Sequence, residues 1–295
     1  MTLRLLHTIG PETPEDTLHL LNVLLRGLDR RFSQSLLVLG PMPEGLRVPE
    51  HVELYRAGAR FGSSMGAVLE IRRLLRRVLP NVVHATSGAD AAAIRAAMWG
   101  STLGVLTTVA DPSEAEGVSR WFRSDELGEI ACTSKTVQRR LVEAGVPMGM
   151  TAVVRPPVDF GALRAARERN LRDELGIAPD ARVLVTPSPP TRAGGQFYAV
   201  WAMAILHQIW PDAVLIVPGV SREADRLRRL MDEIYCPQAF RLTGNRYTTP
   251  ELLSIATALL APAIGDVPTG PVAWAMAAGV PVIGSAVPSI AELIA

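Results

Sequence analysis

The chain has 295 residues, of which 48% are hydrophobic and 20% charged, and its formal net charge is +1. That length suits about two domains with cores of their own. A net charge near zero gives no general attraction to nucleic acid, which we exclude as a partner. Cys132 and Cys236 show no metal-ligand spacing, and neither a signal-peptide pattern nor a membrane-spanning apolar run occurs. We therefore expect a soluble, cytoplasmic protein without a bound metal.

Short apolar runs alternate with segments of helical period, which predicts parallel α/β units. In the first half, the predicted strands are Leu3 to Thr8, Ser35 to Leu39, Val82 to Ala85, Gly104 to Val109, Glu129 to Thr133 and Ala152 to Arg155. The predicted helices are about Pro14 to Leu28, Met65 to Val78, Asp90 to Trp99 and Lys135 to Ala144. Together these elements form one doubly wound domain.

A charged stretch, residues 163–176, separates this series from a second one. We place the boundary near residue 175, which gives an N-terminal domain of residues 1–175, linker included, and a C-terminal domain of residues 176–295. The second series is Val183 to Thr186, Gln196 to Gln208, Val214 to Val217, Glu223 to Ile234, Thr257 to Leu260, Pro271 to Ala278 and Val280 to Ile283. Two similar Rossmann-like domains should face each other, with ligands beyond the carboxyl ends of their strands.

The most informative segment, residues 263–285, reads as an acidic loop, a small-residue helix and a short strand. It resembles the donor-sugar motif of the retaining GT-B glycosyltransferases of family 4, the group 1 transferases. The matching positions are Pro271, Ala275, Met276, Ala277, Gly279, Pro281 and Val282. Asp266 and Trp274 stand where the family carries its two glutamates, so the active-site motif is degenerate.

Weaker matches of the same kind run along most of the chain, at residues 80–85, 130–134, 144–147 and 153–159. The resemblance implies a GT-B fold whose first domain binds the acceptor and whose second binds a nucleotide-diphosphate sugar. Transfer of the sugar would proceed with retention and without a metal or other cofactor. Family members continue beyond the position of Ala295, so we expect a truncated or divergent C-terminal end.

The main physical demand of such a transfer is to stabilise the departing diphosphate, which cations and backbone amides at helix starts can do. Thr269, Gly270 and Pro271 open the helix of the motif and are candidates for that role. In the family an arginine and a lysine also serve it, but Pro189 and Gly194 occupy their positions here. Arg192 could take over their part; otherwise it is a solvent-facing loop arginine.

The remaining donor-side candidates follow from the same resemblance. Asp266 would accept hydrogen bonds from sugar hydroxyls, or else form an ordinary Asx turn. Trp274 would pack against the sugar or base, or else lie in the core, which is the better expectation for an aromatic residue on such a helix. The turn that holds the base would contain Thr243, Gly244 and Arg246, and Gly194 and Gly219 complete the predicted nucleotide site.

On the acceptor side, Asp111 remains from a motif whose histidine is replaced by Ala110. Gly10 still permits a tight turn after the first strand, although the family's glycine pair is missing. His84 ends a predicted strand toward the ligand-binding edge. It could act in catalysis or acceptor binding, but a structural histidine held by backbone hydrogen bonds is the more common case.

Residues 67–79 form a basic amphipathic helix that could touch an anionic membrane, or could pack on the sheet with its basic face in solvent. The acceptor could be a glycan, a lipid or a small molecule. Two functions stay open: a glycosyltransferase, and a non-catalytic homologue that binds a nucleotide, a glycan or a partner protein. A dehydrogenase is disfavoured, since no Gly-x-Gly-x-x-Gly follows a strand.

Overall fold

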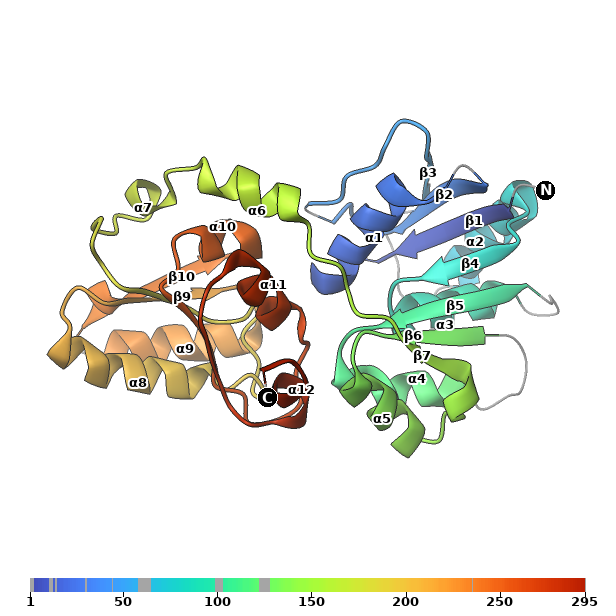
Figure 1. The fold of residues 1–295 in the computed structure, drawn as a ribbon. Helices are drawn as coiled ribbons and strands as arrows, with labels where there is room; N and C mark the ends of the chain where they lie inside the picture. Colours follow the sequence, from blue (N-terminus) through green and yellow to red (C-terminus); the bar gives the residue numbers. More distant parts are fainter. Residues whose placement is uncertain are drawn as a thin grey trace. The chain divides into compact units, whose positions relative to one another are not determined.

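A computed structural model describes residues 3–10, 13, 15–29, 31–43, 45–57, 65–98, 103–121, 128–234 and 236–294. The chain divides into two compact units, residues 1–157 and residues 158–295. Each unit is a parallel sheet with helices packed against it (Figure 1). The predicted fold class, two Rossmann-like α/β domains, is confirmed.

The sheet of unit 1 has seven strands in the described residues, in the order β3-β2-β1-β4-β5-β6-β7. Its strands are β1 (Leu3–Ile9), β2 (Phe32–Leu39), β3 (Glu53–Ala57), β4 (Val82–Ala85), β5 (Gly104–Val109), β6 (Gly128–Cys132) and β7 (Thr151–Val153). Its helices are α1 (Glu15–Gly27), α2 (Met65–Val78), α3 (Gly88–Ala97), α4 (Ala115–Trp121) and α5 (Lys135–Glu143), with short 3₁₀ turns η1 (Pro112–Glu114) and η2 (Met148–Met150). Strand β3 and helix α4 were not predicted, because neither carries a clear apolar period.

Unit 2 contains a five-stranded sheet in the order β10-β9-β8-β11-β12. Its strands are β8 (Val183–Val185), β9 (Val214–Pro218), β10 (Phe240–Gly244), β11 (Ala258–Ala261) and β12 (Val282–Gly284). Its helices are α6 (Phe160–Arg167), α7 (Leu171–Glu174), α8 (Gln196–Ile209), α9 (Arg222–Glu233), α10 (Thr249–Ser254), α11 (Gly270–Ala278) and α12 (Pro288–Ile294), with η3 (Pro237–Ala239) before β10. Strand β10 and the helices α6, α7, α10 and α12 are additions to the predicted series.

The division between the units falls after Pro157, earlier than the predicted boundary near residue 175. The reason lies in the charged stretch, which folds as α6 and α7 on unit 2. Leu163 and Leu171 join the core of that unit. Arg172 donates hydrogen bonds to the carbonyls of Ala181 and Ile255, at 3.0 and 3.1 Å. The segment read as a linker is therefore part of unit 2.

Alternation along the strands of unit 2 builds a core on each face of its sheet. On one face, Val183 and Val185 pack with residues of α6, α10, α11 and α12. On the other, Leu215 and Val217 pack under α8 and α9. No helix of the described residues is both long and apolar enough to cross a membrane.

Candidate functional site

The carboxyl ends of β8, β9, β10 and β11 in unit 2 carry loops that are joined to one another. The Gly219 amide donates to the Gly244 carbonyl at 2.8 Å, which ties the β9 loop to the β10 loop. The Ser221 hydroxyl donates to the Pro190 carbonyl at 2.7 Å, and the Ile264 amide donates to the Ala193 carbonyl at 2.8 Å. The loop after β8 is thus bonded to the loops after both β9 and β11, and the four loops form one surface.

Two glycines make the close approach of these loops possible. Gly195 has φ +67, and a Cβ there would lie 1.9 Å from the Pro262 carbonyl oxygen. Gly219 has φ +93, and a Cβ there would lie 2.6 Å from the Pro189 Cα. Neither the backbone conformation nor the space admits a side chain. Gly219, predicted to contact nucleotide, thus also has a packing role.

The loop after β8 is held from below by Gln196, which the sequence reasoning did not single out. The Gln196 side chain donates to the Pro187 carbonyl at 3.1 Å and accepts from the Thr191 amide at 3.3 Å. The Gly194 amide donates to the Thr191 hydroxyl at 2.9 Å, and Gly194 itself is buried. Arg192 is exposed on this braced loop, next to the point where it meets the loop after β11.

The loop after β11 presents Asp266 half-buried, between exposed Ile264 and a buried helix start. The Val267 amide donates to the Ser289 hydroxyl at 3.0 Å, which anchors the loop to α12. The three residues that were predicted to bind ligand at the start of α11, Thr269, Gly270 and Pro271, are buried. The exposed residue of this loop is Ile264, and of the Asp266 carboxylate the Oδ1 atom is buried.

Trp274 lies in the core, with 2% of its surface exposed. It packs in the cluster that also holds Val272 and Ala275. The sequence left two alternatives for Trp274, contact with the ligand and burial in the core. The structure shows burial in the core, so the prediction that Trp274 contacts the ligand is wrong. An aromatic ring replaces the family's second glutamate because the position faces the interior here.

The turn after β10 has the expected form. The Arg246 amide donates to the Thr243 carbonyl at 3.3 Å, and Gly244 takes φ +56. The Thr243 hydroxyl is buried without a hydrogen-bond partner among the described residues. Arg246 is exposed, with its guanidinium 5.2 Å from the centre of the Tyr247 ring.

In unit 1, a buried polar ladder crosses four strands on the face covered by α1. The Thr108 hydroxyl lies 2.8 Å from His84 Nε2, His84 Nδ1 lies 2.9 Å from His7 Nδ1, and His7 Nε2 lies 3.2 Å from Gln34 Oε1. The Gln34 amide group donates to the Leu25 carbonyl at 3.3 Å, which fixes its orientation. Each member therefore donates to the next: Thr108 to His84, His84 to His7, His7 to Gln34, and Gln34 to Leu25.

Both histidines of this ladder are held neutral. Burial lowers the pKa of His84 to about 3, assisted by the nearby His7. Burial lowers the pKa of His7 to about 4, although its bond to Gln34 acts in the other direction. His84, a predicted catalytic candidate, is 4% exposed and bonded to side chains of neighbouring strands, where backbone bonds had been expected. In this structure His84 joins neighbouring strands of the sheet.

The carboxyl edge of the unit 1 sheet holds two acids that the sequence reasoning missed, the buried Asp90 and the half-buried Glu114. Burial raises the pKa of Asp90 to about 6, although it accepts hydrogen bonds from the Thr86 hydroxyl and the Gly10 amide. Burial likewise raises the pKa of Glu114 to about 7, although Glu114 accepts from the Gly88 amide at 3.1 Å. The negative charge of Asp111 acts in the same direction on Glu114. Each acid follows a strand and lies in the first turn of a helix. Acidic residues are common at helix starts, so the sequence gives no sign that these two differ from others.

The predicted residues Gly10 and Asp111 border these acids. A Cβ at Gly10 would lie 2.6 Å from Asp90 Oδ1, so the glycine makes room for a carboxylate of the protein itself. Asp111 is half-buried and accepts a hydrogen bond from the Ser113 amide at 2.8 Å. Pro11, Glu12 and Pro14 of the predicted turn lie outside the described residues, as does Trp99 of a predicted helix.

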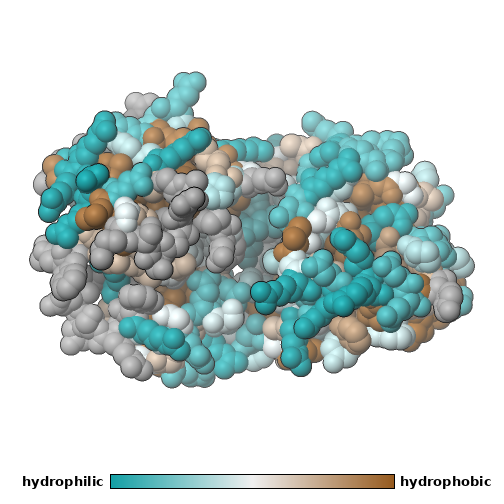
Figure 2. Space-filling model, turned by 180° about the vertical axis from the view of Figure 1, so that it is seen from behind, coloured by the Kyte–Doolittle hydropathy of each residue, from teal (hydrophilic) through white to brown (hydrophobic). Residues whose placement is uncertain are grey.

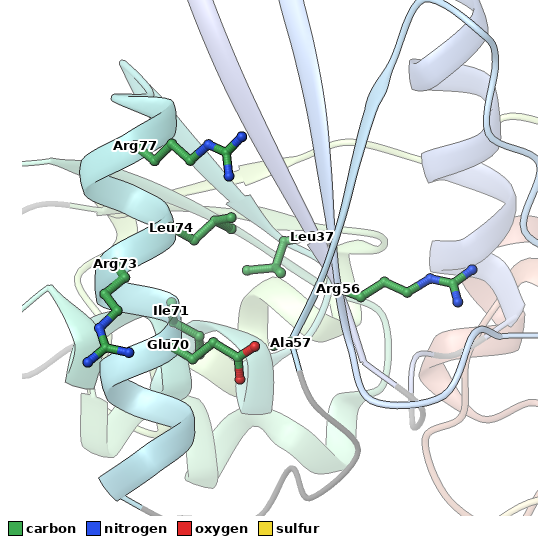
Figure 3. Close-up of a pocket in the computed structure, with 8 residues that line it drawn as sticks. All are labelled: Leu37, Arg56, Ala57, Glu70, Ile71, Arg73, Leu74 and Arg77. Carbon is green, nitrogen blue, oxygen red and sulfur yellow. The ribbon is translucent and has the colours of Figure 1, made fainter.

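A cavity of about 200 Å³ lies elsewhere in unit 1, between α2 and the strands β2 and β3. Arg56, Arg73 and Arg77 line it, but their guanidinium groups extend in different directions (Figure 3). Helix α2 buries Ile71 and Leu75 against the sheet and exposes most of its arginines, as the packing alternative expected. No group of three or more His, Cys, Asp or Glu in the described residues could hold a metal ion.

The chain resembles several solved structures over nearly its whole length. It matches HepE from Anabaena, solved with UDP-glucose, with a TM-score of 0.78 and 17% identity over 99% of this chain and 83% of that one. It matches WaaG, a glycosyltransferase involved in lipopolysaccharide biosynthesis, with a TM-score of 0.71 and 17% identity over 98% and 83% of the two chains. The UDP-GlcNAc 2-epimerase from Neisseria meningitidis matches with a TM-score of 0.64 and 14% identity over 99% and 85%. Such likeness defines the GT-B fold and leaves the reaction open, because an epimerase shares it.

The sequence of unit 2 supplies the class. Residues 181–295 match the family model of the glycosyl transferases group 1. This part of unit 2 therefore resembles the group 1 glycosyltransferases, and the predicted resemblance of the chain to GT-B glycosyltransferases is confirmed. No curated protein matches the chain in sequence.

Proposed function

We propose that the chain transfers a sugar from a nucleoside-diphosphate sugar to an acceptor hydroxyl, with the donor held on the joined loops of unit 2. The observation that carries this proposal is the bonding of the loop with Arg192 to the loop with Asp266 through the Ala193 carbonyl. The two loops that carry this cation and this carboxylate are thereby joined at one edge of a parallel sheet. That edge is where such sheets bind ligands.

The two side chains suit the two ends of a sugar diphosphate. The Arg192 guanidinium can donate in parallel to two phosphate oxygens and can stabilise the charge that grows on the diphosphate as it leaves. The Asp266 carboxylate can accept hydrogen bonds from donor-sugar hydroxyls. Thr243, Gly244 and Arg246 would hold the base, with the buried Thr243 hydroxyl offering one unused hydrogen bond. Retention of configuration and independence of metal follow only from the resemblance to the family.

A uridine nucleotide is the first donor to test. HepE was solved with UDP-glucose, and the epimerase with UDP-GlcNAc. Asp111 remains a candidate for the acceptor side and Gly10 for the nucleotide site, and the acceptor is a glycan, a lipid or a small molecule. Residues 67–79 could touch a membrane if the acceptor is a lipid. The cytoplasm is the expected location.

A second function, binding without catalysis, is favoured by a specific observation. The positions of the family's arginine and lysine are Pro189 and buried Gly194, and the second glutamate is the core residue Trp274. A site that has lost three charged groups retains loops able to bind a nucleotide. Such a protein would hold a nucleotide, a glycan or a partner transferase.

Calorimetric titration with UDP, GDP and ADP in the presence of a chelator tests both functions. We expect saturable binding of one nucleotide, weakened about tenfold to a hundredfold by Arg192→Ala, the loss typical of a charge-assisted pair. Arg228→Ala, an exposed arginine on α9, serves as the control and should bind as the wild type does. Binding without release of nucleotide diphosphate from any donor would favour the second function. Absence of binding by all three nucleotides would refute both donor-site assignments.

A further inference from the structure

The outer surface of α8 in unit 2 is unusually apolar for a surface helix. We define the α8 outer face as Phe197, Tyr198, Trp201, Ile205 and Ile209, whose exposed fractions are 44%, 55%, 47%, 67% and 67%. Trp210, 42% exposed, directly follows the helix. The helix runs along the outside of unit 2 beside α9 (Figure 1). The rear view in Figure 2 shows hydrophobic residues scattered among hydrophilic ones. Contiguous apolar surface of this kind marks interaction sites.

The side chains of the α8 outer face point away from the hydrophobic core of unit 2. Helix α8 buries Ala199, Val200 and Met203 against the sheet. Successive residues of an α-helix are rotated by about 100°, so Trp201 and Ile205 stand within about 20° of the direction opposite to Met203. Repacking within unit 2 cannot cover a face that points directly away from its core.

The α8 outer face also lacks charge. No Asp, Glu, Lys or Arg occurs between Ala193 and Pro211, and His207 is buried. The neighbouring helix α9 shows the usual surface composition, with four arginines and four acidic residues among its twelve. An interfacial membrane helix would carry basic residues toward the lipid head groups. The absence of charge favours a protein partner over an anionic bilayer.

We propose that the α8 outer face is the interface of a symmetric dimer, in which a second copy of this chain packs the same face against it. Phe197, Trp201, Ile205 and Ile209 form one ridge with a spacing of four residues. Ridges with this spacing pack into each other's grooves at crossing angles of about −50°. A two-fold axis between Trp201 and Ile205 places the Trp201 of each copy beside the Ile205 of the other. An isologous contact needs no charge complementarity, which an uncharged ridge could not supply.

The available area agrees with a moderately stable dimer. Aromatic side chains cover 150–250 Å² each, so three of them about half exposed, together with the two isoleucines, give roughly 500 Å² per copy. A dimer would bury on the order of 1,000 Å², the lower range of specific interfaces, which suits a weak and reversible association. Trp201 lies at the centre of the face, where binding energy concentrates.

Sedimentation of the full chain over a range up to about 100 μM should show a reversible monomer–dimer equilibrium. Trp201→Glu should weaken the dimer at least about 30-fold, the loss expected for a central aromatic residue. Leu69→Glu, which places the same charge at a 48% exposed position on α2, should leave it unchanged. Circular dichroism of each variant confirms folding.

A mixing experiment tests the symmetry itself. Trp201→Glu and Ile205→Lys should each be monomeric alone but should associate when mixed, because the new glutamate meets the new lysine while the second contact stays native. Wild-type protein that is monomeric throughout the range, a dimer that survives Trp201→Glu, or mixed variants that stay apart would each overturn the proposal. Binding of monomeric protein to vesicles of phosphatidylcholine and phosphatidylserine, abolished by Trp201→Glu, would assign the face to a bilayer instead.

Discussion

The loops and helix starts at the carboxyl edges of the two sheets are held by different kinds of hydrogen bonds. In unit 1, the protein supplies its own anions: Glu114 accepts from the Gly88 amide at the start of α3, and Asp90 accepts from the Gly10 amide. In unit 2, the loops bond to one another through their backbones and leave an exposed arginine, Arg192, beside them. The edge of unit 1 thus holds carboxyl groups, whereas the edge of unit 2 carries an arginine together with Asp266. If the proposed function holds, we expect the donor diphosphate to bind on unit 2 and the acceptor on unit 1.

The largest effect on the joined loops of unit 2 should come from a substitution that forces two of them apart. Gly195→Ala places a Cβ 1.9 Å from the Pro262 carbonyl oxygen in a left-handed conformation, and should cost about 3–4 kcal/mol of unfolding free energy and abolish nucleotide binding. Gly176→Ala is the matched control: it has φ +61 but no atom within 4 Å of the new Cβ, and should cost about 1 kcal/mol. Equal losses in urea unfolding of the two variants would show that loop contact is not what Gly195 provides.

The buried histidines of unit 1 should make that unit sensitive to acid. Their pKa values are lowered in the folded state, to about 4 for His7 and about 3 for His84, so the unfolded state binds more protons below pH 6.5. Stability is therefore full above pH 6.5 and falls as pH decreases, by about 2 kcal/mol per histidine at pH 5. The double variant His7→Leu, His84→Leu should flatten urea-unfolding free energies between pH 7 and 5. His19→Leu, on α1, should retain the wild-type slope, and a flat wild-type profile would contradict the description of the ladder.

Glu114, at the carboxyl edge of unit 1, should change the pH dependence of stability in the opposite direction to the histidines. Burial raises the pKa of Glu114 to about 7, so the folded state binds more protons, and stability is lost as pH rises through that value. Glu114→Gln keeps an acceptor for the Gly88 amide without the charge. It should stabilise the protein by about 1–2 kcal/mol at pH 8 and change little at pH 4. A variant that is less stable than the wild type at pH 8 would show that the charge itself is required there.

Much of the fold could be predicted because alternating apolar runs are a local property of the sequence. Apart from β3 and β10, the strands of both sheets lie where the pattern indicated them, as do the long helices α1, α2, α5, α8 and α9. Edge strand β3 was missed since only Ala57 of its residues is buried. The domain boundary was placed late because charge along residues 163–176 hid Leu163 and Leu171, whose burial depends on a partner surface distant in sequence.

The site was predictable only where a backbone turn defines it. The turn at Thr243 to Arg246 and the Asp266 loop were predicted from the resemblance to the family, whose motifs are defined by residues close together in the sequence. The burial of Asp90 and Glu114, which shifts their pKa values, arises from packing between α3, α4 and the sheet. Trp274 illustrates the same limit, because a motif position states which residue is present and not which way it faces.

The polar ladder of unit 1 has a consequence for how its strands align. A parallel sheet covered on both faces by aliphatic side chains tolerates a shift of one strand by two residues, since the same faces stay buried. Such a shift in β1 or β4 would separate His7 from His84 and leave buried polar groups unsatisfied, at about 1–3 kcal/mol each. The ladder therefore favours a single alignment of β2, β1, β4 and β5, because only that alignment pairs Thr108, His84, His7 and Gln34. The same alignment determines where the loops after β1, β4 and β5 begin relative to one another.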